Sequence, residues 1–302
     1  MFAATGNKNS DGSSRPSFNR AVAKGLPRRC ICQGHTKKKG QEMRTTARKT
    51  IALGFVGGTM AVWALLAAAQ NNEAREKPRL YTYSANWVIP RAKWDDMEKA
   101  STADSKILEA AVAKGSILAY GDNETLVHQV EGSTHDNWWV ATSIAGLLDT
   151  LEEFYKSKSA VSPVLASATK HWDSIYVSRF YGWRAGTVKG GYVHGAAYKF
   201  KSSAPNDALE TLSKNFIAPL FEKLMADGTV QAYQIAEESV HTTDPDMFFI
   251  FYVTPNSQGI DKTNAALRAA LGENALAGPA FSSLVDYSVH RDDLGRANAT
   301  FK

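Results

Sequence analysis

The sequence predicts an α+β fold in residues 80–302, built from two consecutive copies of a βαββαβ unit. Strand-like and helix-like segments follow the same order twice, in residues 80–184 and 192–302. Identical residues also recur at a constant spacing of 113: Gly115, Ala119, Tyr120, Val127 and His128 match Gly228, Ala232, Tyr233, Val240 and His241. Because the matches fall on corresponding segments, they indicate an internal duplication.

The first copy opens with a strand over residues 80–89, rich in the Tyr, Thr, Trp and Val residues that favour strands. A helix follows, with apolar residues every three or four positions from Trp94 to Val112 and Gly115 as its C-cap. The remaining elements are two strands at 116–130 and 138–144, a helix with Leu147, Leu148, Leu151, Phe154 and Tyr155 on one face, a linker at 157–170, and a strand at 174–183.

The second copy repeats this order, with Gly190 and Gly191 as the hinge between the copies. A helix interrupted or restarted at Pro219 ends before Gly228. Its apolar face carries Leu209, Leu212, Phe216, Leu220 and Leu224, and a second helical face carries Ile260, Leu267, Ala270 and Leu271. The predicted strands are 192–200, 229–241, 247–254 and 283–290.

This element order resembles a known group of proteins. The βαββαβ unit is the ferredoxin-like motif, and two copies in one chain resemble a fused version of the dimeric α+β barrel superfamily. The resemblance implies two sheets packed into a barrel with the helices outside. Known members include cofactor-free monooxygenases, haem-degrading oxygenases, haem enzymes and stress proteins of unknown activity. The resemblance is topological and brings no catalytic residue with it.

The charge of the chain is divided unevenly. Residues 1–69 hold 12 of the 35 Lys and Arg residues and only Asp11 and Glu42 of the 30 acids, which leaves 23 basic and 28 acidic residues in the remainder. A mildly acidic remainder gives no electrostatic reason for nucleic-acid binding, so we expect no nucleic-acid partner.

The two cysteines, Cys30 and Cys32, also lie in the first 69 residues. The remainder can therefore form no disulfide and no thiolate metal site, and we expect no metal centre. Cys30, Cys32 and His35 give the alternative of a metal-binding fragment, but their spacing matches no zinc pattern.

Residues 43–69 have the order of a secretory signal sequence. Arg44, Arg48 and Lys49 precede an uncharged run that ends in three alanines, which predicts cleavage between Ala69 and Gln70. N-terminal sequencing of exported protein should then begin at Gln70. The protein would be periplasmic or extracellular, and the alternative is a retained membrane anchor over residues 50–69.

Residues 1–42 are polar and lack apolar periodicity, so we expect a disordered leader. The purine-rich codons that can encode residues 38–42 suggest a ribosome-binding site before Met43, in which case the leader is not translated. An organelle transit peptide is the alternative. Residues 70–79 are expected to link the signal sequence to the folded part.

Standard catalytic motifs are missing from the sequence. There is no Walker loop, no G-x-G-x-x-G after a strand, no H-E-x-x-H and no G-x-S-x-G, so nucleotide binding, zinc proteolysis and α/β-hydrolase chemistry lack support.

The remaining candidates are aromatic and titratable residues on the predicted strands. Tyr81, Tyr83 and Trp87 share one strand face, as do Tyr192, His194, Tyr198 and Phe200, and each set suits either core packing or an aromatic-lined cavity. His128 and His241 stand eight residues after Tyr120 and Tyr233, which predicts one shared strand face in each copy. The ligand-binding candidates are Tyr83, Trp87, Tyr120, His128, Arg179, His194, Tyr198, Tyr233, His241 and Arg291.

Two functions remain open from the sequence. One is an exported binding or structural protein that holds a small apolar or planar ligand in an aromatic-lined cavity. The other is an enzyme of the cofactor-free monooxygenase or haem-dependent oxygenase type. The sequence identifies no cofactor and no oligomeric state.

Overall fold

A computed structural model of the chain describes residues 74–127 and 130–302. They belong to one of two compact units of the chain, Phe55–Lys302. The expected leader, signal sequence and cleavage site at Ala69 and Gln70 lie outside the described residues, as does His128. Within the described ranges, no helix is long and apolar enough to cross a membrane.

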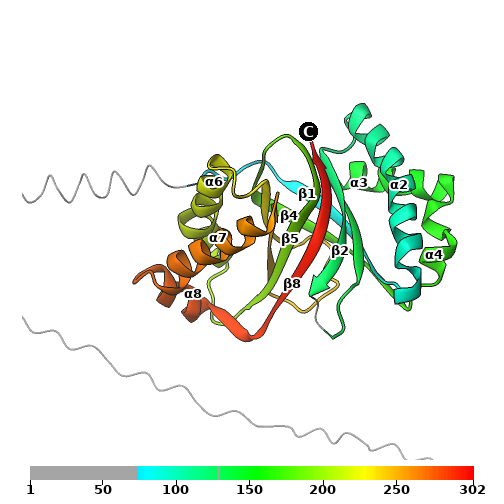
Figure 1. Ribbon diagram of the computed structural model, residues 1–302. Helices are drawn as coiled ribbons and strands as arrows, with labels where there is room; N and C mark the ends of the chain where they lie inside the picture. Colours follow the sequence, from blue (N-terminus) through cyan, green and yellow to red (C-terminus); the bar gives the residue numbers. More distant parts are fainter. Residues whose placement is uncertain (1–73, 128–129) are drawn as a thin grey trace, which may run out of the picture. The chain divides into compact units, whose positions relative to one another are not determined.

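Eight strands of the described chain close into an antiparallel barrel (Figure 1). Around the barrel their order is β1-β3-β2-β8-β5-β7-β6-β4. The strands are β1 (Leu80–Val88), β2 (Ala119–Val127), β3 (His135–Ala141), β4 (Lys170–Trp183), β5 (Gly186–Phe200), β6 (Ala232–Glu238), β7 (Met247–Thr254) and β8 (Val285–Phe301). The expectation of an α+β barrel is confirmed.

The helices lie outside the barrel in two groups on opposite sides (Figure 1). The helices of one group connect the strands of residues 80–183, and the helices of the other group connect the strands of residues 186–301. The helices are α2 (Trp94–Lys114), α3 (Ile144–Ser157) and α4 (Pro163–Ala166) in the first group, and α5 (Ala208–Leu212), α6 (Ala218–Ala226), α7 (Ser257–Leu267) and α8 (Ala277–Leu284) in the second.

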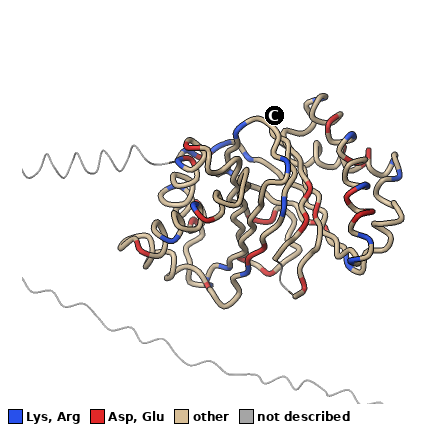
Figure 2. Tube along the Cα trace, in the orientation of Figure 1, with Lys and Arg blue, Asp and Glu red and all other residues tan. Residues whose placement is uncertain are grey.

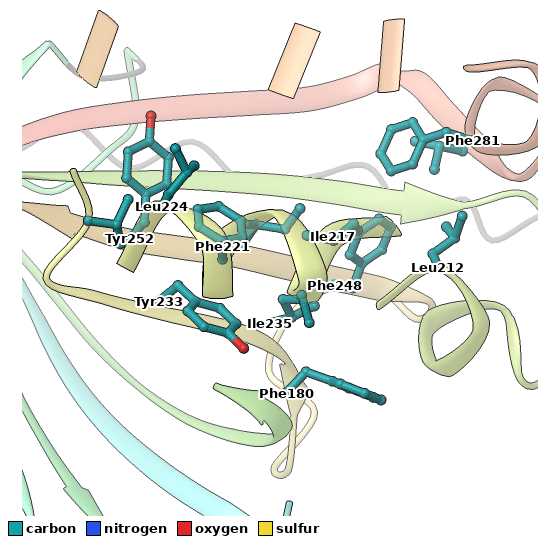
Figure 3. Packing of buried hydrophobic residues seen from close by; sticks show 14 of the residues in the cluster. Phe180, Leu212, Ile217, Phe221, Leu224, Tyr233, Ile235, Phe248, Tyr252 and Phe281 are labelled. Atoms are coloured by element: carbon teal, nitrogen blue, oxygen red, sulfur yellow. The ribbon is translucent and has the colours of Figure 1, made fainter. Parts of the chain in front are cut away.

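Each helix group covers one apolar face of the barrel. In the first group, Leu108 and Leu147 pack against Trp139 of β3. In the second group, Phe221 of α6 is fully buried and stacks on Tyr233 of β6 at 5.1 Å between ring centroids (Figure 3). Burying these side chains provides most of the stability of such amphipathic helices.

The expected helix ends and interruptions agree with the structure. Gly115 and Gly228 follow α2 and α6 with φ angles of 78° and 81°, the left-handed conformation that glycine adopts without strain. A π-helical turn over Ser213–Ile217 leads directly into α6, which begins next to Pro219. Proline lacks the N–H of a regular helix, so the backbone changes its bonding pattern there.

Several expected elements differ from the observed ones. The predicted linker at 157–170 contains α4, and the described end of the 70–79 linker is bonded to the barrel, since Lys77 N donates to Arg179 O at 2.8 Å. Gly190 and Gly191 lie inside β5 at a register shift against β8, and not between strands. β5 begins already at Gly186, because its early residues pair with the end of β8.

The last strand differs most from the prediction of residues 283–290. Ser283 belongs to α8, and β8 runs from Val285 to Phe301. The charged sequence after His290 has weak strand propensity, but it pairs with β2 on one side and β5 on the other. Tertiary pairing therefore overrides local preference here.

Candidate functional site: the barrel interior

The alternation of side chains along β1 separates two environments. Tyr83 and Ala85 belong to the core beneath the helices, while Thr82, Ser84 and Asn86 point into the barrel. The barrel interior is therefore lined from β1 by small polar side chains. It encloses a cavity of about 410 Å³.

One end of this cavity is apolar. Val140, Val253 and Phe301 pack together there with Leu80, which lies at the start of β1. Trp138 approaches Phe301 with 6.0 Å between their ring centroids, and this aromatic pair helps to fill the end of the barrel. The side chains present an apolar surface suited to an apolar part of a ligand.

Gly121 gives Trp138 its position. A Cβ atom at Gly121 would lie 2.5 Å from Cζ2 of Trp138 and 2.6 Å from the backbone oxygen of Asn298. The indole can therefore lie across β2 only because residue 121 has no side chain.

The other end of the cavity is polar. β1 passes from Thr82, opposite Val140, to Asn86, opposite Asp136, so the lining changes from apolar to polar along the barrel axis. Polar residues from β2 and β4 join this end, and the loops after β2 and β6 border it. They are Asn123, Thr125, Ser174 and Tyr176 on the strands and Gly132, Ser133 and Thr243 in the loops.

Asp136 is the acidic group at the centre of the polar end. Asn123 Nδ2 donates a hydrogen bond of 2.6 Å to its Oδ1 atom. Burial raises the pKa of Asp136 to about 7, and the hydrogen bond from Asn123 opposes this rise. The side chain keeps some exposed area because it borders the cavity, but it lies inside the barrel without a basic partner in the described part of the chain.

Three aromatic rings line the same cavity, and Tyr176 among them lies near this acid. Tyr176 of β4 contacts Phe249 and Phe251 of β7 edge-on, with centroid distances of 5.0 and 5.3 Å. Burial raises the pKa of the Tyr176 hydroxyl to about 12, and the charges of Glu238, Asp136 and Asp293 add to the rise. The hydroxyl is therefore neutral at physiological pH.

Two amide groups in the lining lack hydrogen-bond partners among the described residues. Asn123 Oδ1 is an unpartnered acceptor on a residue that is only 7% exposed. Gln234 Nε2 is an unpartnered donor, although Thr82 Oγ1 donates to the Oε1 atom of the same side chain at 3.0 Å. A buried polar group without a partner costs free energy that a ligand can recover.

Glu238 holds the loop at the mouth of the cavity. Its carboxylate accepts hydrogen bonds from the backbone N–H and the hydroxyl of both Thr242 and Thr243, at 2.8 to 3.0 Å. Thr243 itself borders the cavity. The mouth is thereby fixed by a buried acid and not left to loop motion.

A second cavity, of about 320 Å³, lies between the first part of the barrel and α3 and α4. His171 stacks on Trp87 at 3.6 Å, and its Nε2 atom lies 3.3 Å from Asp173 Oδ2. Its Nδ1 atom lies 3.0 Å from the carbonyl oxygen of Asn86. Burial and Asp173, which accepts a hydrogen bond from Tyr83, raise the pKa of the Tyr83 hydroxyl.

A similar histidine arrangement occurs beneath the second helix group. His290 stacks on Tyr198 at 4.2 Å, with Nε2 3.1 Å from Asp292 Oδ2 and Nδ1 3.0 Å from the carbonyl oxygen of Ala197. His194 Nε2 lies 3.8 Å from the other oxygen of Asp292. Burial lowers the pKa of His194, while Asp292 opposes this effect.

Most aromatic candidates from the sequence face the helices and not the barrel interior. Tyr83 stacks on Trp139 at 4.4 Å, and Tyr120 is buried in the same core. Tyr198 packs on Phe248. Tyr233 borders the main cavity, but its hydroxyl donates to Glu222 Oε1 at 2.8 Å and its ring lies on Phe221.

The candidate histidines and arginines are dispersed. β6 ends at Glu238, so the expectation that His241 shares a strand face with Tyr233 is wrong, and His241 is exposed in the following loop. Arg179 pairs with Glu76 at 2.7 Å at the surface. Arg291 borders the main cavity, but its NH1 group donates to the carbonyl oxygens of Ser288 and His290.

The residues that define the main cavity were missed in the sequence. Asn123, Asp136, Tyr176 and Gln234 belong to no motif, and they come from four different strands. The available signal was the opposite face of the first strand, where Thr82, Ser84 and Asn86 alternate with the aromatic residues.

The described residues also bear on metals and haem. Within the described ranges, no group of three or more His, Cys, Asp or Glu side chains is arranged to hold a metal ion. A histidine that holds haem iron needs a free ring nitrogen facing a cavity. His171 borders the second cavity, but both of its nitrogens face oxygen atoms and its ring is covered by Trp87, so this residue does not fit an axial ligand.

Comparison with known proteins gives the fold alone. No family model matches the sequence, and no curated protein matches it. A candidate monooxygenase from Lactobacillus acidophilus superposes with a TM-score of 0.52 at 11% identity, over 74% of this chain and 97% of that one. One from Fusobacterium nucleatum gives 0.50 at 6% identity, over 75% and 95%. The likeness supports a barrel of the dimeric α+β type.

Proposed function

We propose that the protein binds a small, mainly apolar molecule with a polar end inside its barrel. One observation carries the proposal: a cavity of about 410 Å³ whose lining is apolar at one end and polar at the other. Ligand sites in proteins typically have volumes of roughly 300 to 1,000 Å³, apolar walls and a few convergent polar groups.

The two ends would contribute differently to binding. The side chains around Val140 and Val253 would remove apolar ligand surface from water, at about 25 cal/mol for each Å² buried. At the other end, Asn123 Oδ1 offers an acceptor, and nearer the apolar end Gln234 Nε2, on the side chain bonded to Thr82, offers a donor. A ligand that satisfied them would also relieve the cost of leaving them unpaired, which favours a molecule of defined orientation.

Filling the cavity should abolish binding of a neutral apolar probe. Gly195 lines the cavity, and a Cβ atom there would meet only the Phe251 ring, at 3.4 Å. We expect wild type to bind N-phenyl-1-naphthylamine with a fluorescence increase and Gly195→Leu to bind it at least about tenfold more weakly. Gly272→Leu adds the same side chain at an exposed position and should bind as wild type does. No binding by wild type, or equal binding by Gly195→Leu, would contradict the proposal.

We further propose that the barrel is a tandem duplication of two ferredoxin-like units, residues 80–184 and 192–302. The spacing of 113 recurs in strand pairing, where Ala119 lies opposite Val140 and Ala232 opposite Val253. Each set of four strands also has the same order in the barrel, β4-β1-β3-β2 and β8-β5-β7-β6.

The same spacing relates details that topology does not require. Ser143 caps α3 by accepting from Gly146 N, and Asn256 caps α7 by accepting from Gly259 N. A Cβ atom at either glycine would lie 2.8 Å from a backbone oxygen, of Ser116 or of Thr229. Ser116, Ser143 and Gly146 each lie 113 positions before the corresponding Thr229, Asn256 and Gly259. This constant spacing favours a common origin of the two units over convergence.

A cofactor-free oxygenase is the second candidate function. The second cavity holds Tyr83, His171 and Asp173 beside Trp87, and the Asp173 carboxylate can accept a proton from a phenol. The similar barrels of the two candidate monooxygenases agree with this class. The reaction would convert a phenol and O₂ into a quinone and water, with the phenol supplying the electrons.

Oxygen uptake with 1-naphthol tests this second candidate. We expect catalysed uptake in wild type and a loss of about 10²-fold or more in Asp173→Asn, because a general base typically contributes that much. Asp244→Asn removes the charge of an exposed acid outside this cavity and should change nothing. The second candidate fails if wild type takes up no oxygen above the uncatalysed rate.

Export of the protein, with cleavage between Ala69 and Gln70, is part of the proposal. Its support is the order of charged, apolar and small residues in 43–69.

A further inference from the structure

We propose that the ligand of the barrel carries a protonated amine, held between Asp136, Asn123 and the aromatic rings of Tyr176, Phe249 and Phe251. This inference rests on the proposed function, since it assumes that the barrel interior is a binding site. It adds the chemical class of the ligand.

The polar end holds two neighbouring groups that can only accept hydrogen bonds, the carboxylate of Asp136 and the amide oxygen of Asn123. Asp136 Oδ1 already accepts from Asn123 Nδ2 at 2.6 Å, and Asn123 Oδ1 has no partner among the described residues although Asn123 is only 7% exposed. An ammonium group has three donors and no acceptor, so it can bond to the carboxylate and to the amide oxygen together. A carboxylate ligand would face two acceptors and be repelled.

The charge at this end is negative. Asp136 and Asp293 both line the cavity, and Figure 2 shows Asp and Glu positions grouped on the barrel strands. Arg291 is the basic residue in the lining, and it is exposed and donates to backbone oxygens of its own strand, β8. A cationic ligand would supply the positive charge that Asp136 lacks within the described residues.

The aromatic rings suit the same ligand. Tyr176 contacts Phe249 and Phe251, all three line the cavity, and Trp172 lies nearby in the lining. A cation over an aromatic face is stabilised by the ring quadrupole, more strongly when water is excluded. Rings beside a carboxylate are a typical environment for an ammonium group.

Three compounds with the same ring system and different charge test the inference: 1-naphthylmethylamine, 1-naphthalenemethanol and 1-naphthoate. Each would be titrated into the full exported chain by calorimetry at about pH 8. We expect the amine to bind at least about tenfold more tightly than the alcohol and the carboxylate most weakly. Asp136→Asn should remove the preference for the amine and keep binding of the alcohol.

Asp122→Asn is the matched control. Asp122 precedes Asn123 on β2 and accepts from Asn298 Nδ2 at 3.1 Å, and it is not part of the cavity lining. The variant removes the same charge from the same region, so it should keep most of the preference for the amine.

The preference should also fall with pH, because Asp136 becomes protonated. The charged or titratable groups around it in the described chain are Asp122 on β2, Tyr176 on β4, Glu238 on β6, and Asp293 and Arg291 on β8. We expect a smaller preference at about pH 5.5 than at about pH 8 in wild type, and no such difference in Asp136→Asn.

The outcomes separate this inference from the proposed function. The inference of an amine ligand is wrong if the alcohol binds as tightly as the amine, or if the preference for the amine survives Asp136→Asn. Either result leaves the proposal of binding inside the barrel intact. Tighter binding of 1-naphthoate than of 1-naphthylmethylamine would also contradict the amine ligand without contradicting binding inside the barrel. If none of the three compounds nor N-phenyl-1-naphthylamine binds, barrel binding itself is wrong.

Discussion

Asp136→Asn is expected to stabilise the free protein at about pH 8, raising the free energy of unfolding by about 2 to 4 kcal/mol. Burial raises the pKa of Asp136 to about 7 in the folded state, against about 3.9 in an unfolded chain. The folded state therefore binds the proton more tightly. Stability is greatest below the unfolded pKa, falls as the pH rises between the two values, and is fully reduced above about 7.

The upper limit follows from the difference of about three pKa units, each equivalent to about 1.4 kcal/mol. Water in the cavity reduces the effect, because Asp136 borders that space. Asparagine has nearly the same shape and carries no charge, so the variant lacks the penalty at any pH.

Urea unfolding of both proteins at about pH 4.5 and pH 8 measures the effect. The difference between them should be small at the lower pH and large at the higher. His135, whose pKa burial lowers to about 4, contributes equally to both proteins and cancels. Asp244→Asn changes an exposed acid and should shift stability by less than about 0.5 kcal/mol. An unchanged or lower stability of Asp136→Asn at pH 8 would contradict the burial argument.

A residue that destabilises the free protein at neutral pH is easier to explain by function than by folding. Buried titratable groups with shifted pKa values concentrate at binding and catalytic sites. Asp136 fits this pattern because an amine bound beside it would offset the cost of its charge. The stability lost in the free protein would then reappear as binding free energy.

The sequence predicted those parts of the fold that depend on local signals. The glycine caps at Gly115 and Gly228 and the apolar spacing of the helices depend only on nearby residues, and both agree with the structure. The predicted last strand is shorter than β8 because the second half of β8 is charged. Pairing with β2 and β5 holds this half in the sheet. Long-range pairing leaves little trace in the local sequence.

The site was less predictable than the fold. Tyr83 and Trp87 were correctly assigned to one strand face, but the sequence did not determine whether that face met the helices or the barrel interior. Asn123, Asp136 and Tyr176 come together only when the barrel closes, and none has a distinctive neighbour in sequence. A site assembled from four strands cannot be read as a motif.

Gly121→Val should destabilise the protein by about 3 kcal/mol, as expected for overpacking that neighbouring atoms cannot relieve. The new Cβ would lie 2.5 Å from the Trp138 ring and 2.6 Å from the backbone oxygen of Asn298. The ring could move only into the apolar end of the cavity, and the backbone oxygen belongs to β8, the strand next to β2. Both responses would open or strain the closed end of the barrel.

Gly195→Val is the matched control, because it places the same side chain on another strand lining the cavity. Its Cβ would meet only Phe251 ring atoms at 3.4 Å, so the loss of stability should stay below about 1 kcal/mol. Denaturant midpoints measure the stability of both variants. Binding of N-phenyl-1-naphthylamine to Gly121→Val, at a temperature where this variant remains folded, reports on the cavity. If the two variants were equally stable, Gly121 would not be the residue that allows Trp138 to close the apolar end. The difference between the apolar and the polar end of the cavity would then need another structural cause.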